Sequence, residues 1–407
     1  MSSPVSTDRP PPWLDPRTAY VHVPFCGHHC GYCDFAVTAG QDHLIDLYLE
    51  SLAEEMRTNG PAAVETLFIG GGTPTYLSAA QLARLLDTIT RWMTPETGGR
   101  YLEFSIESTP ESLDAEKARV LADFGVNRVS VGVQSFQAHT LAALDRRHGV
   151  EQIGRAVDAV RRFVPAVSFD LIFAAPGQSP AEWQADLAAA LRFEPDHLST
   201  YGLTYEKGTP LWKERAKGRV SPVPESDELA MYLHAIDALS EAGFEHYEIS
   251  NFAKPGRRSV HNMRYWANEA YHGFGVGAAR YVSGSRELNV RDTKLYIQRV
   301  LAGESPTFQA ERLGERDRAF ETVATQLRRA DGIDRPRFAE QTGTALDELL
   351  GDRLAGTVAA GLLSDNGVSV RLTRQGKCVA DGIIEELMKA NDPPSSLQRG
   401  GRVSPRA

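Results

Sequence analysis

Short apolar runs alternate with longer amphipathic stretches along the first half of the chain, from Tyr20 to about Glu206. The run VETLFIGGG, for example, predicts a strand that ends in glycines, and the following AAQLARLLDTITRWM has the period of a helix. Strands that alternate with helices of this length form right-handed crossovers, which build a parallel sheet. About six such units predict an α/β fold, a full or partial barrel of strand–helix units.

The polar residues that stand out in this half follow the ends of predicted strands. They are the cysteine-rich stretch CGHHCGYC, the glycines of FIGGGTPT, Glu107, Gln134 and Asp170. In barrels of this kind the chemistry lies at the carboxyl ends of the strands. The sequence therefore predicts that these residues meet at one mouth of the barrel.

The pattern changes after about residue 210. The stretch ELAMYLHAIDALSEAG predicts one long helix, and an aromatic, glycine-rich stretch follows from Tyr247 to Tyr281. From about Glu311 to Lys389 we expect helices with one hairpin, because the DNG of LLSDNGVSVRLTRQG supplies a turn between apolar runs, as in a small winged-helix module. The expected divisions are a barrel over 17–250, a connecting region over 251–310 and a C-terminal domain over 311–390, flanked by disordered segments at 1–16 and 391–407.

The overall composition excludes several classes of function. A net charge of −9 argues against binding to duplex nucleic acid, which requires a concentrated basic face. No apolar run reaches the length of a membrane span, and the N-terminal residues lack the apolar core of a signal peptide. With only four cysteines, no disulfide framework is expected, and clustered thiols indicate a metal in a reducing cytoplasm.

Three of the four cysteines, Cys26, Cys30 and Cys33, have the spacing C-x3-C-x2-C. Three thiolates suit a [4Fe–4S] cluster that keeps one iron open for a ligand. Structural zinc would need a fourth protein ligand, which His22, His28 or His29 would have to provide. A loop without metal is the third interpretation. Cys378 lies far away in sequence, and we expect a buried structural thiol there.

The context of these cysteines decides between the three interpretations. YVHVPFCGHHCGYCDF is similar to the signature of the radical S-adenosylmethionine (SAM) superfamily, and GGGTPT, SIESTPESL, SVGVQSF, LDRRHG and FDLIFAAPGQ follow in that superfamily's order. The resemblance implies a partial (β/α)6 radical SAM barrel in which the three cysteines hold the cluster. It also implies that the open iron chelates the amino and carboxylate groups of SAM. The residues that it implies for SAM binding are Tyr20, Tyr32, Gly71, Gly72, Thr73, Glu107, Gln134, Arg146 and Asp170.

Within the superfamily, the chain resembles the coproporphyrinogen III oxidase group. The true oxygen-independent oxidases carry a further cysteine two positions after the third, where this chain has Phe35. CGYCDF and HNMRYW resemble instead the HemW heme chaperones. This resemblance implies binding of heme, delivery of heme to recipient apo-hemoproteins, and homodimerisation. The alternatives are an oxidase that decarboxylates coproporphyrinogen III and, less favoured by the acidic composition, a radical SAM enzyme that modifies RNA.

His261, in HNMRYW, is the expected heme contact, because a neutral imidazole is a standard axial ligand of heme iron. Tyr265 and Trp266 add flat apolar surface beside it. The alternative is a histidine that is hydrogen-bonded among core aromatics. One departure concerns the stretch GFGVGAARYV, where HemW relatives commonly have Gly-Ala-His and this chain has Ala279.

Overall fold

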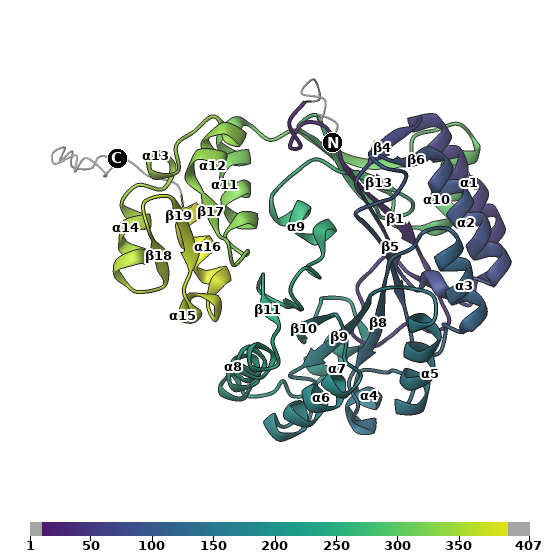
Figure 1. Ribbon diagram of the computed structural model, residues 1–407, viewed down its shortest axis with the longest axis horizontal. Coiled ribbons are helices and arrows are strands. Elements are labelled where there is room, and N and C mark those ends of the chain that lie inside the picture. Colours follow the sequence, from purple (N-terminus) through teal and green to yellow (C-terminus); the bar gives the residue numbers. More distant parts are fainter. Residues whose placement is uncertain (1–9, 390–407) are drawn as a thin grey trace, which may run out of the picture.

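The computed structural model describes residues 10–389 (Figure 1). Its centre is a nine-stranded sheet with the strand order β11-β12-β10-β9-β8-β7-β5-β1-β13. Six neighbouring strands of this sheet run parallel, as the strand–helix alternation predicts. They are β1 (Thr18–Val23), β5 (Thr66–Gly71), β7 (Glu103–Ser108), β8 (Arg128–Gln134), β9 (Val167–Phe173) and β10 (His197–Gly202).

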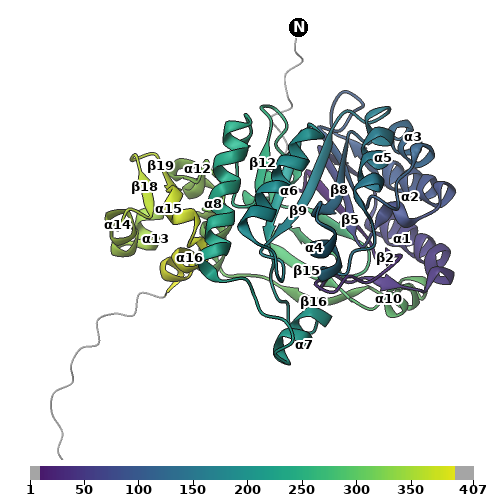
Figure 2. The ribbon, with the colours of Figure 1, turned by 90° about the horizontal axis from the view of Figure 1, so that it is seen from below.

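Helices cover the outer, convex face of this sheet (Figures 1 and 2). Two of them begin with a capping box, in which Ser78 or Ser179 accepts a hydrogen bond from the third helical amide and so fixes where the helix starts. The apolar face of each helix packs on alternate strand residues such as Leu67 and Ile69, which are fully buried. The covering helices are α1 (Ile45–Asn59), α2 (Ala79–Trp92), α3 (Ala115–Asp123), α5 (Val150–Arg161), α6 (Pro180–Arg192) and α8 (Glu225–Glu241).

The other face of the sheet is polar and lines the barrel interior. Successive side chains of a strand point to opposite faces, so the residues between the apolar ones face inward. Register places Gly70 beside Glu107 and Gly132 beside Asp170 on this inner face. A parallel sheet is usually apolar on both faces. Polar residues on one face therefore indicate that this side holds a ligand.

The sheet curls into an open barrel, and the region after residue 244 supplies its two edges. Strand β13 (His272–Phe274) adds in parallel to β1. At the other edge β12 (Asn251–Ala253) pairs antiparallel with β10, and β11 (Glu245–His246) pairs antiparallel with β12. The short helix α9 (Val260–Trp266) lies in the concave space between the sheet and the C-terminal domain (Figure 1). The rest of the connecting region forms a separate sheet, β14 (Ala279–Val282), β15 (Ser285–Asn289) and β16 (Thr307–Glu311), and helix α10 (Thr293–Leu301).

The C-terminal domain has its own core, built around residues such as Phe338, Leu350 and Val370. The predicted hairpin is present, since β18 (Leu363–Asp365) pairs antiparallel with β19 (Ser369–Leu372), which also pairs with β17 (Ile333–Asp334). The domain stands beside α8 (Figure 2). Its helices are α11 (Glu315–Gln326), α12 (Arg335–Thr342), α13 (Leu346–Leu350), α14 (Asp352–Ala359), α15 (Arg374–Lys377) and α16 (Ala380–Met388).

Several shorter elements complete the description: β2 (Phe25–Cys26), β3 (Thr38–Ala39), β4 (Ala62–Val64), β6 (Met93–Pro95), α4 (Ala138–Ala143) and α7 (Pro210–Ala216), with 3-10 turns over Asp42–Leu44 and Pro74–Tyr76. No helix among residues 10–389 is long and apolar enough to cross a bilayer. The predicted disordered tail at 391–407 and residues 1–9 of the predicted N-terminal segment lie outside the described residues.

Candidate functional site

The barrel encloses a cavity of about 1070 Å³. Cavities that bind small molecules usually measure about 300–1,000 Å³, so this one lies at the upper end of that range. All of the site residues predicted from the sequence line it, although they come from seven separate segments of the chain. They are Tyr20, Cys26, Cys30, Tyr32, Cys33, Gly71, Gly72, Thr73, Glu107, Gln134, Arg146, Asp170 and His261.

The three cysteines lie in the loop that follows β1, at the rim of the cavity. Cys26 is buried, and Cys30 and Cys33 are half-buried; all are free thiols. His22 anchors the far end of the loop, because its Nε2–H donates to the Ala36 carbonyl at 2.9 Å while its Nδ1 accepts from the Tyr20 hydroxyl at 3.0 Å. The loop is thus held from inside the barrel while its sulfurs face the cavity.

The surroundings of the thiols favour metal coordination. Burial raises the pKa of Cys26 to about 12 and also raises that of Cys33, so these thiols are protonated until a bound cation stabilises their thiolates. Positive and hydrogen-bonding groups already face the sulfurs. The Thr73 hydroxyl donates to Cys26 Sγ at 3.6 Å, and Arg146 Nη1 donates to Cys30 Sγ at 3.4 Å.

The arrangement does not suit a single zinc ion. In the described part of the chain, no three His, Cys, Asp or Glu side chains converge closely enough to hold one metal ion. The imidazoles considered as fourth ligands have other neighbours, since His28 lies 2.9 Å from Asp145 and His29 hydrogen-bonds the Cys33 carbonyl at 3.1 Å. A [4Fe–4S] cluster takes each thiolate on a different iron, so its ligands need not meet at one point.

Glycines form the turn that follows β5, where the cavity wall passes directly behind the cysteine loop. Gly71 has a φ of 110°, and a side chain there would overlap the ring of His22. A side chain on Gly72 would come within 2.7 Å of the Pro24 carbonyl oxygen. The amides of both residues already donate within the protein, to Glu107 and to Val23. Glycine is therefore required at both positions because no side chain fits between the turn and its neighbours.

Two carboxylates face the middle of the cavity. Burial, reinforced by the charge of Asp170, raises the pKa of Glu107 to about 7 even though Gly71 N–H donates to it at 2.9 Å. Burial also raises the pKa of Asp170, which accepts from the Ser130 hydroxyl at 2.9 Å. Carboxylates in such a site can accept hydrogen bonds from ribose hydroxyls or offset the positive charge of a sulfonium.

Gln134 ends β8 in an unusual backbone conformation. Its φ is 64°, a value that non-glycine residues rarely adopt, and the pairing of β8 with β9 is irregular here. Asp186 holds the following turn, since it accepts from the Ser135 hydroxyl at 2.7 Å and from the Phe136 amide at 2.8 Å. Strain of this kind concentrates at functional sites, where neighbouring contacts maintain it.

The two tyrosines differ in their surroundings. Tyr20 stacks on Phe68 with ring centroids 6.2 Å apart, inside the barrel. Tyr32 belongs to the cysteine loop and packs on a small buried cluster that includes Leu144 and Ile172. Phe35, at the position of the extra oxidase cysteine, is 66% exposed at the cavity rim.

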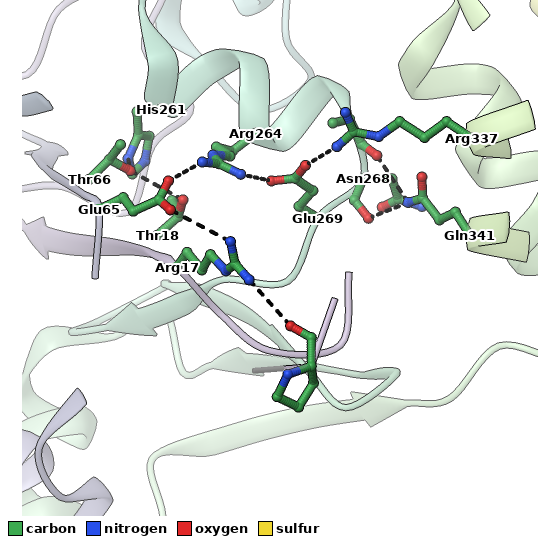
Figure 3. A network of polar contacts seen from close by, with 12 residues as sticks. Arg17, Thr18, Glu65, Thr66, His261, Arg264, Asn268, Glu269, Arg337 and Gln341 are labelled. Carbon is green, nitrogen blue, oxygen red and sulfur yellow. Dashed lines mark hydrogen bonds and ion pairs between the residues drawn. The ribbon is translucent and has the colours of Figure 1, made fainter. Parts of the chain in front are cut away.

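His261 lies on α9, at the floor of the cavity, near the amino ends of β5 and β7. Thr66 donates its hydroxyl hydrogen to Thr18 at 3.2 Å, so Thr66 Oγ1 accepts from His261 Nδ1–H at 3.1 Å (Figure 3). Nε2 then carries the lone pair, and this buried atom has no hydrogen-bond partner. Burial lowers the pKa of His261 to about 4, so the imidazole is neutral at physiological pH.

Helix α9 also connects the floor to the C-terminal domain. Arg264 pairs with Glu65 on one side and with Glu269 at 2.7 Å on the other, and Glu269 pairs with Arg337 of α12, also at 2.7 Å (Figure 3). Gln341 caps the end of α9 through the carbonyls of 267 and 268. The helix that carries His261 is therefore held by contacts with both the barrel and the C-terminal domain.

The floor contains two charged residues that sequence reasoning missed, Glu103 and Arg128. Glu103 Oε2 accepts from the His261 amide at 3.2 Å, and Arg128 is a buried cation at the start of β8. Burial opposes ionisation of Glu103, but the charge of Arg128 and the hydrogen bonds from the Ser105 hydroxyl and the His261 amide hold its pKa below the ordinary value. The sequence did offer one signal for these two residues. Each is a charged residue at the first position of a strand that is expected to be buried.

Two other sequence-based expectations are resolved by the structure. Cys378 is half-buried rather than buried, and its thiol donates to the Arg374 carbonyl at 3.5 Å. Ala279 begins β14 and does not line the cavity.

Comparison with known proteins agrees with this geometry. The family model of the radical SAM superfamily matches residues 20–190, and the model of the HemN C-terminal domain matches residues 313–379. The heme chaperone HemW of Bacillus subtilis is 36% identical over 90% of this chain and 98% of its own length. HemW of Mycobacterium tuberculosis is 34% identical, with coverages of 92% and 95%.

The chain belongs to the HemW family. The fold is also that of the coproporphyrinogen III oxidase HemN from Escherichia coli, with a TM-score of 0.80 over 92% of this chain and 90% of that one, at 22% identity. Membership of the HemW family within the radical SAM superfamily implies a [4Fe–4S] cluster and SAM. The three free thiols at the rim, two of which accept a hydrogen bond from Thr73 or Arg146, fit such a cluster.

Proposed function

We propose that this protein is a heme chaperone, which binds a [4Fe–4S] cluster, SAM and heme and delivers heme to apo-hemoproteins. Cys26, Cys30 and Cys33 would hold the cluster at the rim of the cavity. When bound there, the cluster supplies an open iron that chelates the amino and carboxylate groups of SAM. Glu107, Gln134, Arg146 and Asp170 would orient SAM beneath it. The wider proposal includes a cytoplasmic location and a homodimer.

One observation carries the heme part of the proposal. The Nε2 atom of His261 is buried, carries a lone pair and has no hydrogen-bond partner in the protein. Buried polar atoms without a partner are rare and costly. A neutral imidazole nitrogen is a standard axial ligand of heme iron, and the rings of Tyr265 and Phe68 lie 4.8 Å and 5.1 Å from that of His261. These neighbours would provide an apolar surface for the porphyrin.

The names of the relatives support the same function. Proteins called heme chaperones match this chain over nearly its whole length. The oxidase alternative rests on a fold shared at 22% identity, which by itself carries no activity. Phe35 also replaces the additional cysteine of the oxidases, and a phenyl ring cannot act as a thiol.

The test begins with anaerobic reconstitution of the cluster and titration with hemin, followed by addition of an apo-hemoprotein. We expect stoichiometric hemin binding and transfer of the heme to the acceptor. A parallel sample receives SAM, a reductant and coproporphyrinogen III. Formation of protoporphyrinogen IX would assign the oxidase activity instead, and a protein that binds no hemin would contradict the proposal directly.

A further inference from the structure

Arg128 is a buried cation on the cavity floor that no part of the proposed cluster or SAM site uses. It is the first residue of β8, is only 8% exposed and lines the cavity. The register pairs it with Ser105 of β7, one strand length below the mouth. From Arg128 to Gln134 the strand rises about 20 Å, so the guanidinium and the cysteine loop belong to opposite ends of the cavity.

The hydrogen bonds of this guanidinium are few and long. Nη1 donates to the Arg257 carbonyl at 3.3 Å and Nη2 to the Ser168 hydroxyl at 3.4 Å. Both acceptors are neutral, and no Asp or Glu within residues 10–389 forms an ion pair with Arg128. Arg264 of α9, by contrast, has two carboxylate partners, Glu65 and Glu269. Buried arginines are normally paired, because an uncompensated buried charge is costly.

Arg128 lowers the pKa of the nearby Glu103 by its charge, but no acid among residues 10–389 forms a hydrogen bond or ion pair with the guanidinium. The oxygens of Glu103 accept from the hydroxyls of Ser105 and Ser259 and from the His261 amide. Asp170 accepts from Ser130, and Glu107 accepts from Gly71. The neutral rings of His197 and His261 complete the group of titratable side chains on this side of the cavity. The floor therefore keeps one guanidinium with donor groups available to an incoming anion.

We propose that Arg128 binds a carboxylate of the ligand that occupies the cavity floor, and that this carboxylate is a propionate of the porphyrin. The inference rests on the proposed function for the identity of the ligand. A guanidinium fits a carboxylate with two parallel hydrogen bonds. His261 and Arg128 share one floor, so a single heme can present its iron to one and a propionate to the other. SAM also has a carboxylate, but the cysteines that would recruit it lie at the opposite end.

The experiment compares four cluster-loaded proteins: the wild type, Arg128→Gln, Arg128→Lys and Arg147→Gln. The last is a matched control, because Arg147 is exposed at the cavity mouth and its replacement changes the net charge by the same amount. Each protein is titrated with hemin, with hemin dimethyl ester, whose propionates are blocked, and with SAM. Circular dichroism and iron content verify folding.

We expect Arg128→Gln to weaken hemin binding by about 10- to 100-fold, the range for loss of a charged hydrogen-bonded pair. The ester should bind the wild type about as weakly as hemin binds the variant, and it should not distinguish wild type from Arg128→Gln. Arg128→Lys should restore part of the affinity, and Arg147→Gln should leave it unchanged.

Three results would overturn the inference in different ways. If hemin and its dimethyl ester bind the wild type with equal affinity, the protein recognises no propionate, although it still binds heme. This comparison uses the wild type alone and does not depend on the folding of any variant. If Arg128→Gln weakens SAM and not hemin, the carboxylate comes from SAM and the porphyrin assignment is wrong. If the wild type binds neither hemin nor its ester, the proposed function fails, and the SAM titration alone decides whether Arg128 holds a carboxylate.

Discussion

The rim and the floor of the cavity are assembled from very different stretches of chain. At the rim, three thiols come from one loop between positions 26 and 33. At the floor, Glu103 accepts from the amide of His261, 158 residues further along. A short loop places its ligands together in any fold that it joins, whereas the floor exists only where the barrel closes on α9. The difference shows which parts of a site local sequence can encode.

Strand β7 shows the same contrast within five residues. Glu107 faces the middle of the cavity, and burial beside Asp170 raises its pKa to about 7. Glu103 faces the floor, where the charge of Arg128 and the hydrogen bonds that Glu103 accepts overcome the effect of burial, so its pKa is lowered. Both carboxyls lie on the inner face of one strand, so their opposite behaviour comes from the residues across the barrel.

The largest expected effect comes from the rim. Replacing Cys26, Cys30 and Cys33 together by Ser should remove the iron and inorganic sulfide of the reconstituted protein, because a hydroxyl is a poor ligand for iron–sulfur clusters. Hemin binding at the floor should remain. Elemental and sulfide analysis checks the first result, and hemin titration checks the second.

Cys378→Ser is the matched control and should retain its full cluster. If the triple variant kept iron and sulfide, the ligand assignment would be wrong. If it lost hemin binding together with the cluster while remaining folded, the rim and the floor would act as one site and the comparison would break.

His261→Ala tests the floor separately. Loss of an axial imidazole should weaken hemin binding by at least about tenfold and shift the Soret band, because the iron loses its protein ligand. The iron and sulfide content of the cluster should not change. His43→Ala, an exposed position on the outer surface, serves as the control. An unchanged Soret band and unchanged affinity would remove His261 from the heme site.

The two carboxyls of β7 predict opposite pH effects. The pKa of Glu107 is about 7 in the folded protein, compared with an ordinary value of 4.5. Between these two pH values the folded protein keeps a proton that the unfolded chain has lost. The free energy of unfolding therefore falls as pH rises through this range. Relative to Glu107→Gln, the wild type should lose about 3 kcal/mol of unfolding free energy between pH 5 and pH 8.

Glu103 should behave in the reverse manner. Its folded pKa is lowered, so its ionised form stabilises the protein above the ordinary value of 4.5, and that stabilisation is lost as pH falls through the folded pKa. The stability advantage of the wild type over Glu103→Gln should therefore shrink below about pH 4.5. Denaturant unfolding of the three proteins across pH measures both slopes. Slopes of the same sign would show that the floor charges do not control Glu103.

The smallest expected effect concerns the attachment of the floor to the C-terminal domain. The side chain of Glu269 is 4% exposed and joins Arg264 to Arg337. Removing one member of a buried ion pair costs about 3–5 kcal/mol, but Arg264 keeps Glu65 and Arg337 is half-exposed, so we expect about 2 kcal/mol for Glu269→Gln. Hydrogen exchange should increase in α9 and remain unchanged in the cysteine loop.

The exposed pair of Asp381 with Arg328 provides the control, because Asp381 is 84% exposed and Asp381→Asn should leave the unfolding midpoint almost unchanged. Faster exchange in the cysteine loop of Glu269→Gln would show that the rim also depends on the C-terminal domain. The rim and floor would then be mechanically linked.

The sequence predicted most of the barrel because its signals are local. Apolar periodicity defines β5 and α2 within a few residues of their observed ends, and the DNG turn identifies the hairpin of β18 and β19. The strands that complete the sheet, β11 to β13, were not expected. They have two or three residues each, too few to show a period, and their partners lie far away in sequence.

The candidate site divides in the same way. The cysteines, the glycine turn, Glu107, Gln134, Arg146 and Asp170 stand in recognisable motifs, and the structure brings them to one cavity. Glu103 and Arg128 stand in no such motif. Their local signal is only a charge at the first position of a strand, and their importance follows from what faces them across the barrel.

By itself, the sequence determined the strand–helix order, the cluster of thiols and the family to which the chain belongs. The first two follow from periodicity and spacing, which act over short lengths of chain, and the family follows from the resemblance of the ordered motifs to those of known proteins. Only the tertiary structure decided that His261 lies beneath the cysteine loop with its Nε2 unpartnered, and that Arg128 is buried without a carboxylate. Burial and charge depend on every group that approaches a side chain, and closure of the barrel alone selects those groups.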